Sequence, residues 1–129
     1  MNIITDTNIF LAVVLGEPEK KEIIRLTSEA SAIAPEILPF EVGNALTAMV
    51  KRRQLTADEA VTAYSAVSQI PVRLVSVDIK QAIKLALELN IYAYDAYFLQ
   101  CAKQLSFPLF TLDKRMKQAA RDLNIKLLE

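Results

Sequence analysis

Residues 2–8 read Asn-Ile-Ile-Thr-Asp-Thr-Asn, and similar short apolar segments, each followed by a helix-like segment, recur along the chain. Residues 2–5 are short, apolar and β-branched, which predicts a buried strand. Asp6 follows that strand directly, and the uncharged run at 7–15 has the composition of a helix. A buried strand that ends at an acid and continues into a helix is the beginning of an α/β arrangement.

Short apolar strands and amphipathic helices alternate along the remainder of the chain. We predict further strands at 32–34, 72–75, 107–111 and 125–128, and helices at 17–29, 38–53, 56–70, 78–90, 94–105 and 114–123. In the helix at 78–90, apolar residues recur every four positions at Ile79, Ile83 and Leu87. This alternation predicts an α/β domain with a mostly parallel sheet, whose binding crevice lies beyond the carboxyl ends of the strands.

The composition excludes several classes of enzyme. The chain has no His and one Cys, Cys101, so a Ser-His-Asp triad, an imidazole base, and zinc sites built from His or only from Cys are all impossible. Carboxylates, Lys, Tyr, hydroxyls and hard metal ions remain for chemistry. Lys and Arg together number 15, as do Asp and Glu, so bulk positive charge cannot hold the protein on nucleic acid, although a local basic strip could.

Length and hydropathy indicate one folded domain, residues 1–129, because 53% of the residues are hydrophobic and 23% are charged. The uncharged run from Thr7 to Gly16 is too short to span a bilayer, and no basic segment precedes it. A single Cys gives no sign of an oxidising compartment. We therefore expect a soluble cytoplasmic protein that does not enter a membrane.

Four acids stand apart from all other charges. Asp6 is the only charged residue within 1–16, Glu41 within 37–50 and Asp95 within 89–102, and Asp113 ends an uncharged run that begins at Gln104. An isolated acid in an apolar run is often partly buried, and burial of an uncompensated carboxylate costs several kcal/mol. Each of these acids therefore needs a partner that its sequence neighbours largely fail to supply.

Each acid also has a simpler explanation. Asp6 and Asp113 could cap the helices that follow them, and Asp95 could be a first-turn acid favoured by its helix dipole. Glu41 is the hardest to explain in this way. Asp78 also follows a strand, but it has basic neighbours, and we interpret it as a cap. The functional interpretation depends on the set of four.

If the four acids converge, they form a pocket in which each raises the pKa of the others unless cations are bound. Ligand sets made only of oxygen suit Mg²⁺ or Mn²⁺. Carboxylate-held Mg²⁺ hydrolyses phosphodiesters, and this chemistry requires no His. The set is therefore compatible with metal-dependent hydrolysis of phosphodiesters.

Four stretches of the chain match a known family in order and spacing. They are Ile-Ile-Thr-Asp-Thr-Asn at 3–8, Pro-Phe-Glu-Val-Gly-Asn-Ala-Leu at 39–46, Tyr-Asp-Ala-Tyr-Phe-Leu-Gln-Cys-Ala at 94–102 and Leu-Phe-Thr-Leu-Asp at 109–113. In these stretches the chain resembles the PIN-domain ribonucleases, most closely the VapC-type toxins of prokaryotic toxin–antitoxin pairs. The resemblance spans almost the whole chain.

The resemblance implies a three-layer α/β/α sandwich around a five-stranded parallel sheet. It also implies an endoribonuclease that needs Mg²⁺ or Mn²⁺ and leaves 5′-phosphate and 3′-hydroxyl ends. By analogy Asp6 and Asp95 are the leading metal ligands, and Glu41 and Asp113 complete the catalytic site directly or through water. The supporting residues would be Asn8, Asn44 and Thr111. The implied partners are an RNA substrate, a cognate antitoxin and a second copy in a homodimer or a larger toxin–antitoxin assembly.

Some features allow two interpretations. Lys114 and Arg115 could bind RNA phosphates, or they could simply occupy a solvated helix face. The tyrosines at 92, 94 and 97 could stack on unpaired bases, although the core or a dimer interface is the favoured interpretation.

Two other functions stay open. One is a non-catalytic RNA-binding or regulatory module on the same fold, which would have no need of an acidic cluster. The other is a different Mg²⁺ enzyme such as a phosphatase, which the sequence Asp6-Thr7-Asn8 disfavours because it lacks the second Asp of a D-x-D motif.

Overall fold

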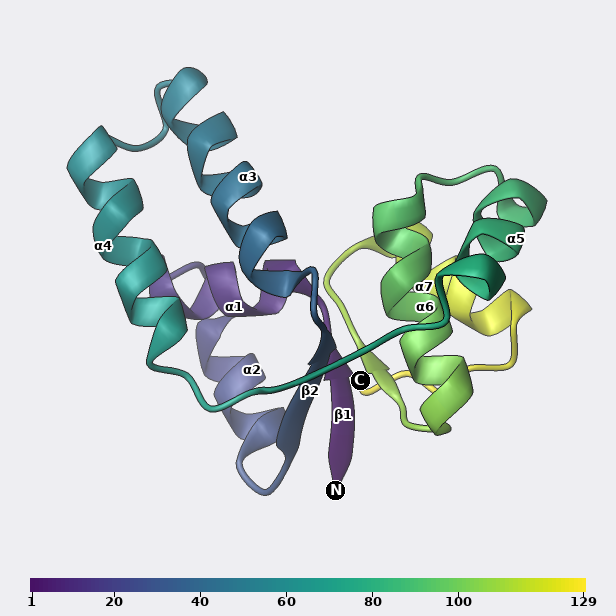
Figure 1. Cartoon of the computed structure of the whole chain (residues 1–129). Coiled ribbons are helices and arrows are strands. Elements are labelled where there is room, and N and C mark those ends of the chain that lie inside the picture. Colours follow the sequence, from purple (N-terminus) through teal and green to yellow (C-terminus); the bar gives the residue numbers. More distant parts are fainter.

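The computed structural model describes residues 1–129 and has helices on both faces of a parallel sheet. In Figure 1, α1 to α4 lie on one side of the strands and α5 to α7 on the other. The elements are β1 (Asn2–Thr5), α1 (Thr7–Val14), α2 (Lys20–Thr27), β2 (Ser31–Pro35), α3 (Leu38–Lys51), α4 (Ala57–Ser68), β3 (Arg73–Val75), α5 (Ile79–Leu89), α6 (Ala93–Leu105), β4 (Leu109–Phe110) and α7 (Lys114–Asp122). The predicted α/β class with a parallel sheet is confirmed.

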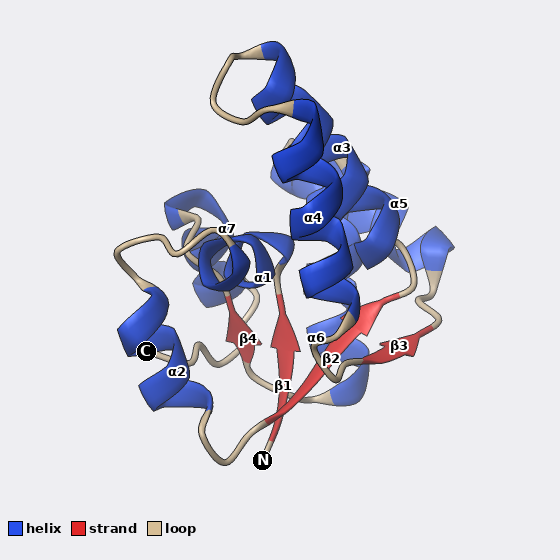
Figure 2. Cartoon of the chain, turned by 90° about the vertical axis from the view of Figure 1, so that its left-hand side faces the viewer, coloured by secondary structure: helices blue, strands red, loops and turns tan.

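The sheet has the strand order β3-β2-β1-β4, and every pair is parallel (Figure 2). Ile4 of β1 pairs with Ile33 of β2 on one side and with Leu109 of β4 on the other. β1 is therefore central, and the residue that follows it lies between the ends of two neighbouring strands.

The sheet has four strands, whereas five were expected. The segment at 125–128 runs beside β4, but it makes only one bridge, between Leu127 and Leu109. Two backbone hydrogen bonds hold it there, from the Leu109 N–H to the Lys126 carbonyl (2.8 Å) and from the Leu128 N–H to the Leu109 carbonyl (2.9 Å). β4 has only two residues, so it offers too short a template for a further strand.

Alternate side chains of β1 belong to two separate cores. Ile4 lies in a large cluster with α3, α4, α5, α6 and α7, whereas Ile3 packs with Ile9, Ala12, Ile23 and Phe110 from the α1 and α2 side. A strand presents successive side chains to opposite faces, and burial on both sides explains its continuous apolar sequence. Cys101 lies fully buried in the larger core.

The apolar residues whose spacing predicted α5 are not the residues that it buries. Its inward face consists of Ala82, Leu85 and Ala86. Ile79, Ile83 and Leu87 lie on the outward side, and these residues are 58%, 47% and 78% exposed. The structure therefore leaves an apolar stripe on the surface of α5.

The largest difference between an expected and an observed helix end lies at the start of α2. The helix predicted at 17–29 begins only at Lys20, because the Lys20 N–H bonds to the Glu17 carbonyl in a tighter turn that contains Pro18. No helix is long and apolar enough to cross a membrane.

Candidate carboxylate site

All four isolated acids lie at element junctions on the carboxyl side of the sheet or at helix starts. Asp6 follows β1, and Asp113 lies between β4 and α7. Glu41 and Asp95 stand in the first turns of α3 and α6. Parallel strands direct their carboxyl ends to one edge, so this placement brings segments from distant parts of the chain together.

Three hydrogen-bond donors hold the Asp6 carboxylate in one orientation. The Thr7 N–H donates to its Oδ1 (2.8 Å) while capping α1, and the Thr111 hydroxyl donates to its Oδ2 (2.7 Å). The Asn8 amide donates to the same Oδ2 and to Thr111 Oγ1, both at 3.3 Å. The Leu112 N–H donates in turn to Asn8 Oδ1 (3.2 Å). This network joins the ends of β1 and β4.

The buried position of Asp6 changes its acidity. Only 7% of the residue is exposed, and this burial raises the pKa of Asp6 from 3.8 to about 6. The hydrogen bonds from Thr111 and Thr7 act in the opposite direction, whereas the charges of Asp95 and Asp113 raise the pKa further. Asp6 is therefore a buried carboxylate close enough to two other acids to be affected by their charge.

Glu41 and Asp95 show the same mutual influence. Burial raises the pKa of Glu41, and the charges of Asp95 and Asp6 add to the rise. Burial also raises the pKa of Asp95, Asp113 adds to it, and Arg115 lowers it. No side-chain ion pair neutralises the group, because the two ion pairs in the chain, Arg25–Glu22 and Arg121–Glu129, lie elsewhere. The four acids therefore form one electrostatically coupled carboxylate cluster.

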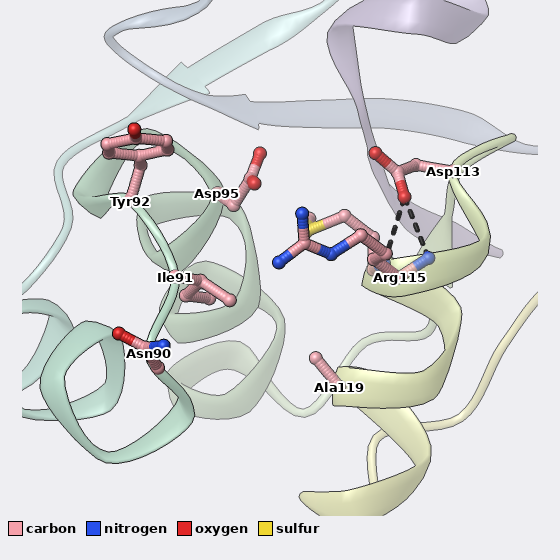
Figure 3. Close-up of a pocket in the computed structure, with 8 residues that line it drawn as sticks. Asn90, Ile91, Tyr92, Asp95, Asp113, Arg115 and Ala119 are labelled. Carbon is pink, nitrogen blue, oxygen red and sulfur yellow. Dashed lines mark hydrogen bonds between the residues drawn. The ribbon is translucent and has the colours of Figure 1, made fainter.

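Asp113 is both a helix cap and a member of this cluster. Its Oδ1 accepts from the N–H groups of Arg115 (2.8 Å) and Met116 (3.2 Å) at the start of α7, as drawn in Figure 3. Its Oδ2 makes no hydrogen bond within the chain. Capping therefore leaves one carboxylate oxygen of Asp113 free.

The supporting residues divide into two groups. Asn8 and Thr111 contact Asp6 directly, as described above. Asn44 is exposed on α3, and its side chain makes no hydrogen bond to any of the four acids. Lys114 and Arg115 are both exposed, and Arg115 lines a cavity beside Asp95 and Asp113.

The sequence interpretation did not single out Asn90, although it lines the same cavity. Asn90 ends α5 in the left-handed region, at φ 54°. Asn at the end of a helical pattern signals such a cap. That signal locates the turn, but it does not show that the turn faces the acids.

The residues of the cluster fit a divalent cation by their chemistry. The possible ligands are carboxylate oxygens that form no ion pair, and Mg²⁺ and Mn²⁺ prefer such oxygen ligands. As arranged, no three acids lie close enough together to hold one ion. Mg²⁺ commonly takes one or two carboxylates and completes its shell with water, so direct ligation by a pair of acids is compatible with this arrangement.

A protein-family model and several solved structures are similar to this chain. The family model of the PIN domain matches residues 3–122. The fold is similar to that of PAE2754 from Pyrobaculum aerophilum, with a TM-score of 0.69, 17% identity, and coverage of 92% of this chain and 79% of that one. It is also similar to VapBC2 from Rickettsia felis, solved bound to a DNA fragment from its promoter, with a TM-score of 0.68, 15% identity, and coverage of 98% and 97%. No curated protein matches the chain.

Proposed function

The chain belongs to the PIN-domain family, whose members are generally nucleases, and we propose that it is a metal-dependent endoribonuclease of the VapC toxin type. The family match covers nearly the whole chain and includes all four acids. The fold likeness to the Rickettsia felis VapBC2 complex supports the toxin type, and the absence of His is compatible with carboxylate–metal hydrolysis.

The observation that carries this proposal is the coupling of the acids. Asp6, Glu41 and Asp95 each have a raised pKa, and in each case another member of the carboxylate cluster contributes to the rise. Such an arrangement is unfavourable for the protein alone at neutral pH and favourable once a cation is bound. A bound Mg²⁺ or Mn²⁺ would supply water activation and neutralisation of the phosphate charge.

The chain's own groups take distinct parts in this proposal. Asp6 and Asp95 would be the principal ligands, and the Thr111 hydroxyl and Asn8 amide keep the Asp6 carboxylate in its orientation. The free Oδ2 of Asp113 would bind the metal ion directly or through a water molecule. Glu41 is half-buried, its carboxylate accepts no hydrogen bond within the chain and its pKa is raised, which suits a group that accepts a proton from the attacking water.

The proposed partners follow from the same assignment. We expect RNA as the substrate, a cognate antitoxin as the inhibitor, and the cytoplasm, where both are made, as the location. The exposed apolar stripe of α5 supports a homodimer, since contiguous apolar surface of this kind marks contact sites.

The proposal is tested by RNA cleavage with the purified protein and two single variants, Asp6→Asn and Asp95→Asn. We expect the wild type to cut RNA in Mg²⁺ or Mn²⁺ and not in EDTA, and both variants to lose cleavage while their thermal unfolding remains cooperative. Full metal-dependent activity in both variants would contradict the assignment. A non-catalytic RNA-binding module would bind RNA without cutting it in either metal.

A further inference from the structure

A cavity of about 420 Å³ opens directly beside the carboxylate cluster, with Asp95 and Asp113 in its wall. One side is the turn between α5 and α6, and the other is the first half of α7 (Figure 3). Its volume lies within the range of roughly 300–1,000 Å³ found for small-molecule sites. The cavity can therefore admit one nucleotide but not a base-paired helix.

The remaining lining combines the groups that recognise an unpaired nucleotide. Ile91, Met116 and Ala119 supply an apolar surface, and Tyr92 stands at the side of the cavity with 84% of its surface exposed. Because it is so exposed, Tyr92 is not part of the hydrophobic core. Unpaired bases are held by stacking on aromatic rings and by hydrogen bonds to their edges.

Two polar groups in the cavity have no partner within the chain. Asn90 lines the cavity and its side-chain amide makes no hydrogen bond, and the Arg115 guanidinium extends between the two walls without an ion pair (Figure 3). An amide presents a donor and an acceptor, as a base edge requires, and a guanidinium matches a phosphate. A free anion fits poorly here because Asp95 and Asp113 are adjacent, whereas a nucleotide can keep its base on the apolar side.

We propose that this cleft binds the nucleotide next to the bond that is cut, with its base against Tyr92 and Asn90 and its phosphate on Arg115. The cleft would thus restrict cleavage to unpaired RNA and select the base at one position beside the cut. This inference rests on the proposed function, since the adjoining carboxylate cluster supplies the reaction.

The test compares cleavage-site sequences and steady-state kinetics on a randomised single-stranded RNA pool in Mn²⁺. The cleft variants are Tyr92→Ala, Arg115→Ala and Asn90→Gly, of which the last removes the amide while keeping a residue suited to positive φ. The matched controls are Tyr64→Ala on α4 and Arg73→Ala on β3, which are exposed residues outside the cavity.

We expect Tyr92→Ala and Arg115→Ala to raise KM about tenfold with kcat within about threefold of wild type, in keeping with a stacking contribution of ~1–3 kcal/mol per base. Asn90→Gly should flatten the base preference at one position beside the cut, and the controls should match wild type. Unchanged KM and unchanged base preference in all three cleft variants would overturn the proposal.

If the wild type cuts no RNA in any metal, the proposed function fails, and the cleft is then tested by binding alone. Fluorescence anisotropy with a labelled single-stranded oligonucleotide should show about tenfold weaker binding for Tyr92→Ala than for Tyr64→Ala. Equal affinities of these two variants, or equal affinity of wild type for single-stranded and duplex RNA, would overturn the cleft assignment.

Discussion

The Thr111 hydroxyl donates a 2.7 Å hydrogen bond to Oδ2 of Asp6 across 105 residues of sequence. Both residues are buried, and they follow adjacent strands of the sheet. The pairing of β1 with β4 therefore places the Thr111 hydroxyl where it orients the Asp6 carboxylate.

Thr111→Val should weaken binding of Mn²⁺ by about tenfold or more, because removal of a group that orients a ligand typically costs 10–100-fold in metal affinity. The change nearly conserves volume at a fully buried position, so the fold should persist. Thr111→Ser keeps the hydroxyl and should bind Mn²⁺ as wild type does. Calorimetric titration of the three proteins checks this, and equal affinity of the Val variant would show that the hydroxyl does not matter.

The metal-free protein should lose stability as pH rises from about 4 to 7. Folding raises the pKa of Asp6 from 3.8 to about 6, so the folded state binds the proton more tightly, and the associated stability is lost as pH passes the folded pKa. At 1.36 kcal/mol per pKa unit, the contribution is about 3 kcal/mol. Glu41 and Asp95, whose pKa values are also raised, act in the same direction.

Urea unfolding in EDTA at pH 4.5 and pH 7.5 measures this effect by comparison with Asp6→Asn. The variant has no titrating group at position 6, so the difference between the two pH values should be smaller in it than in wild type. An identical difference in the two proteins would show that Asp6 titrates normally.

Substitution of Asp113 separates its two roles. Asp113→Asn should preserve the cap on α7, since Asn and Asp are similar at this position, whereas Asp113→Ala should cost about 1 kcal/mol of stability. Both changes remove the carboxylate, so both should reduce RNA cleavage. If the role were only that of a cap, cleavage by the Asn variant would equal that of wild type at equal melting temperature.

Leu87→Lys should dissociate the proposed homodimer. Leu87 is the most exposed member of the α5 stripe, and a buried, unpaired ammonium at an interface is strongly unfavourable. Sedimentation velocity should find a dimer for wild type and a monomer for the variant, with unchanged helical circular dichroism. A variant that stays dimeric would assign the contact to another surface.

Much of this architecture could be predicted from the sequence, because the relevant signals are local. The strand expected at residues 2–5 and the helix expected at 56–70 appear in the structure as Asn2–Thr5 and Ala57–Ser68. The isolation of the four acids led us to expect that they converge. In the structure the charges of cluster members contribute to the raised pKa values of Asp6, Glu41 and Asp95, but no three of the acids lie close enough together to hold one ion.

Other features depend on contacts that no local pattern contains. Spacing identified α5, but whether Ile83 or Leu85 faces inward is decided by the helix packed against it, which is α6. The segment at 125–128 forms no fifth strand because its neighbour β4 has only two residues. Asn90 belongs to the cavity only because the α5–α6 turn comes to lie opposite α7, which is a tertiary relationship.

Calorimetric titration with Mn²⁺ at pH 7.5 tests most directly whether the coupled acids form a cation site. Asp95→Asn is compared with Asp78→Asn, a change at an acid that caps α5 and lies outside the carboxylate cluster. We expect wild type and Asp78→Asn to bind Mn²⁺ equally, and Asp95→Asn to bind at least about tenfold more weakly, since it loses a proposed ligand. Equal Mn²⁺ affinity in all three proteins would contradict the account.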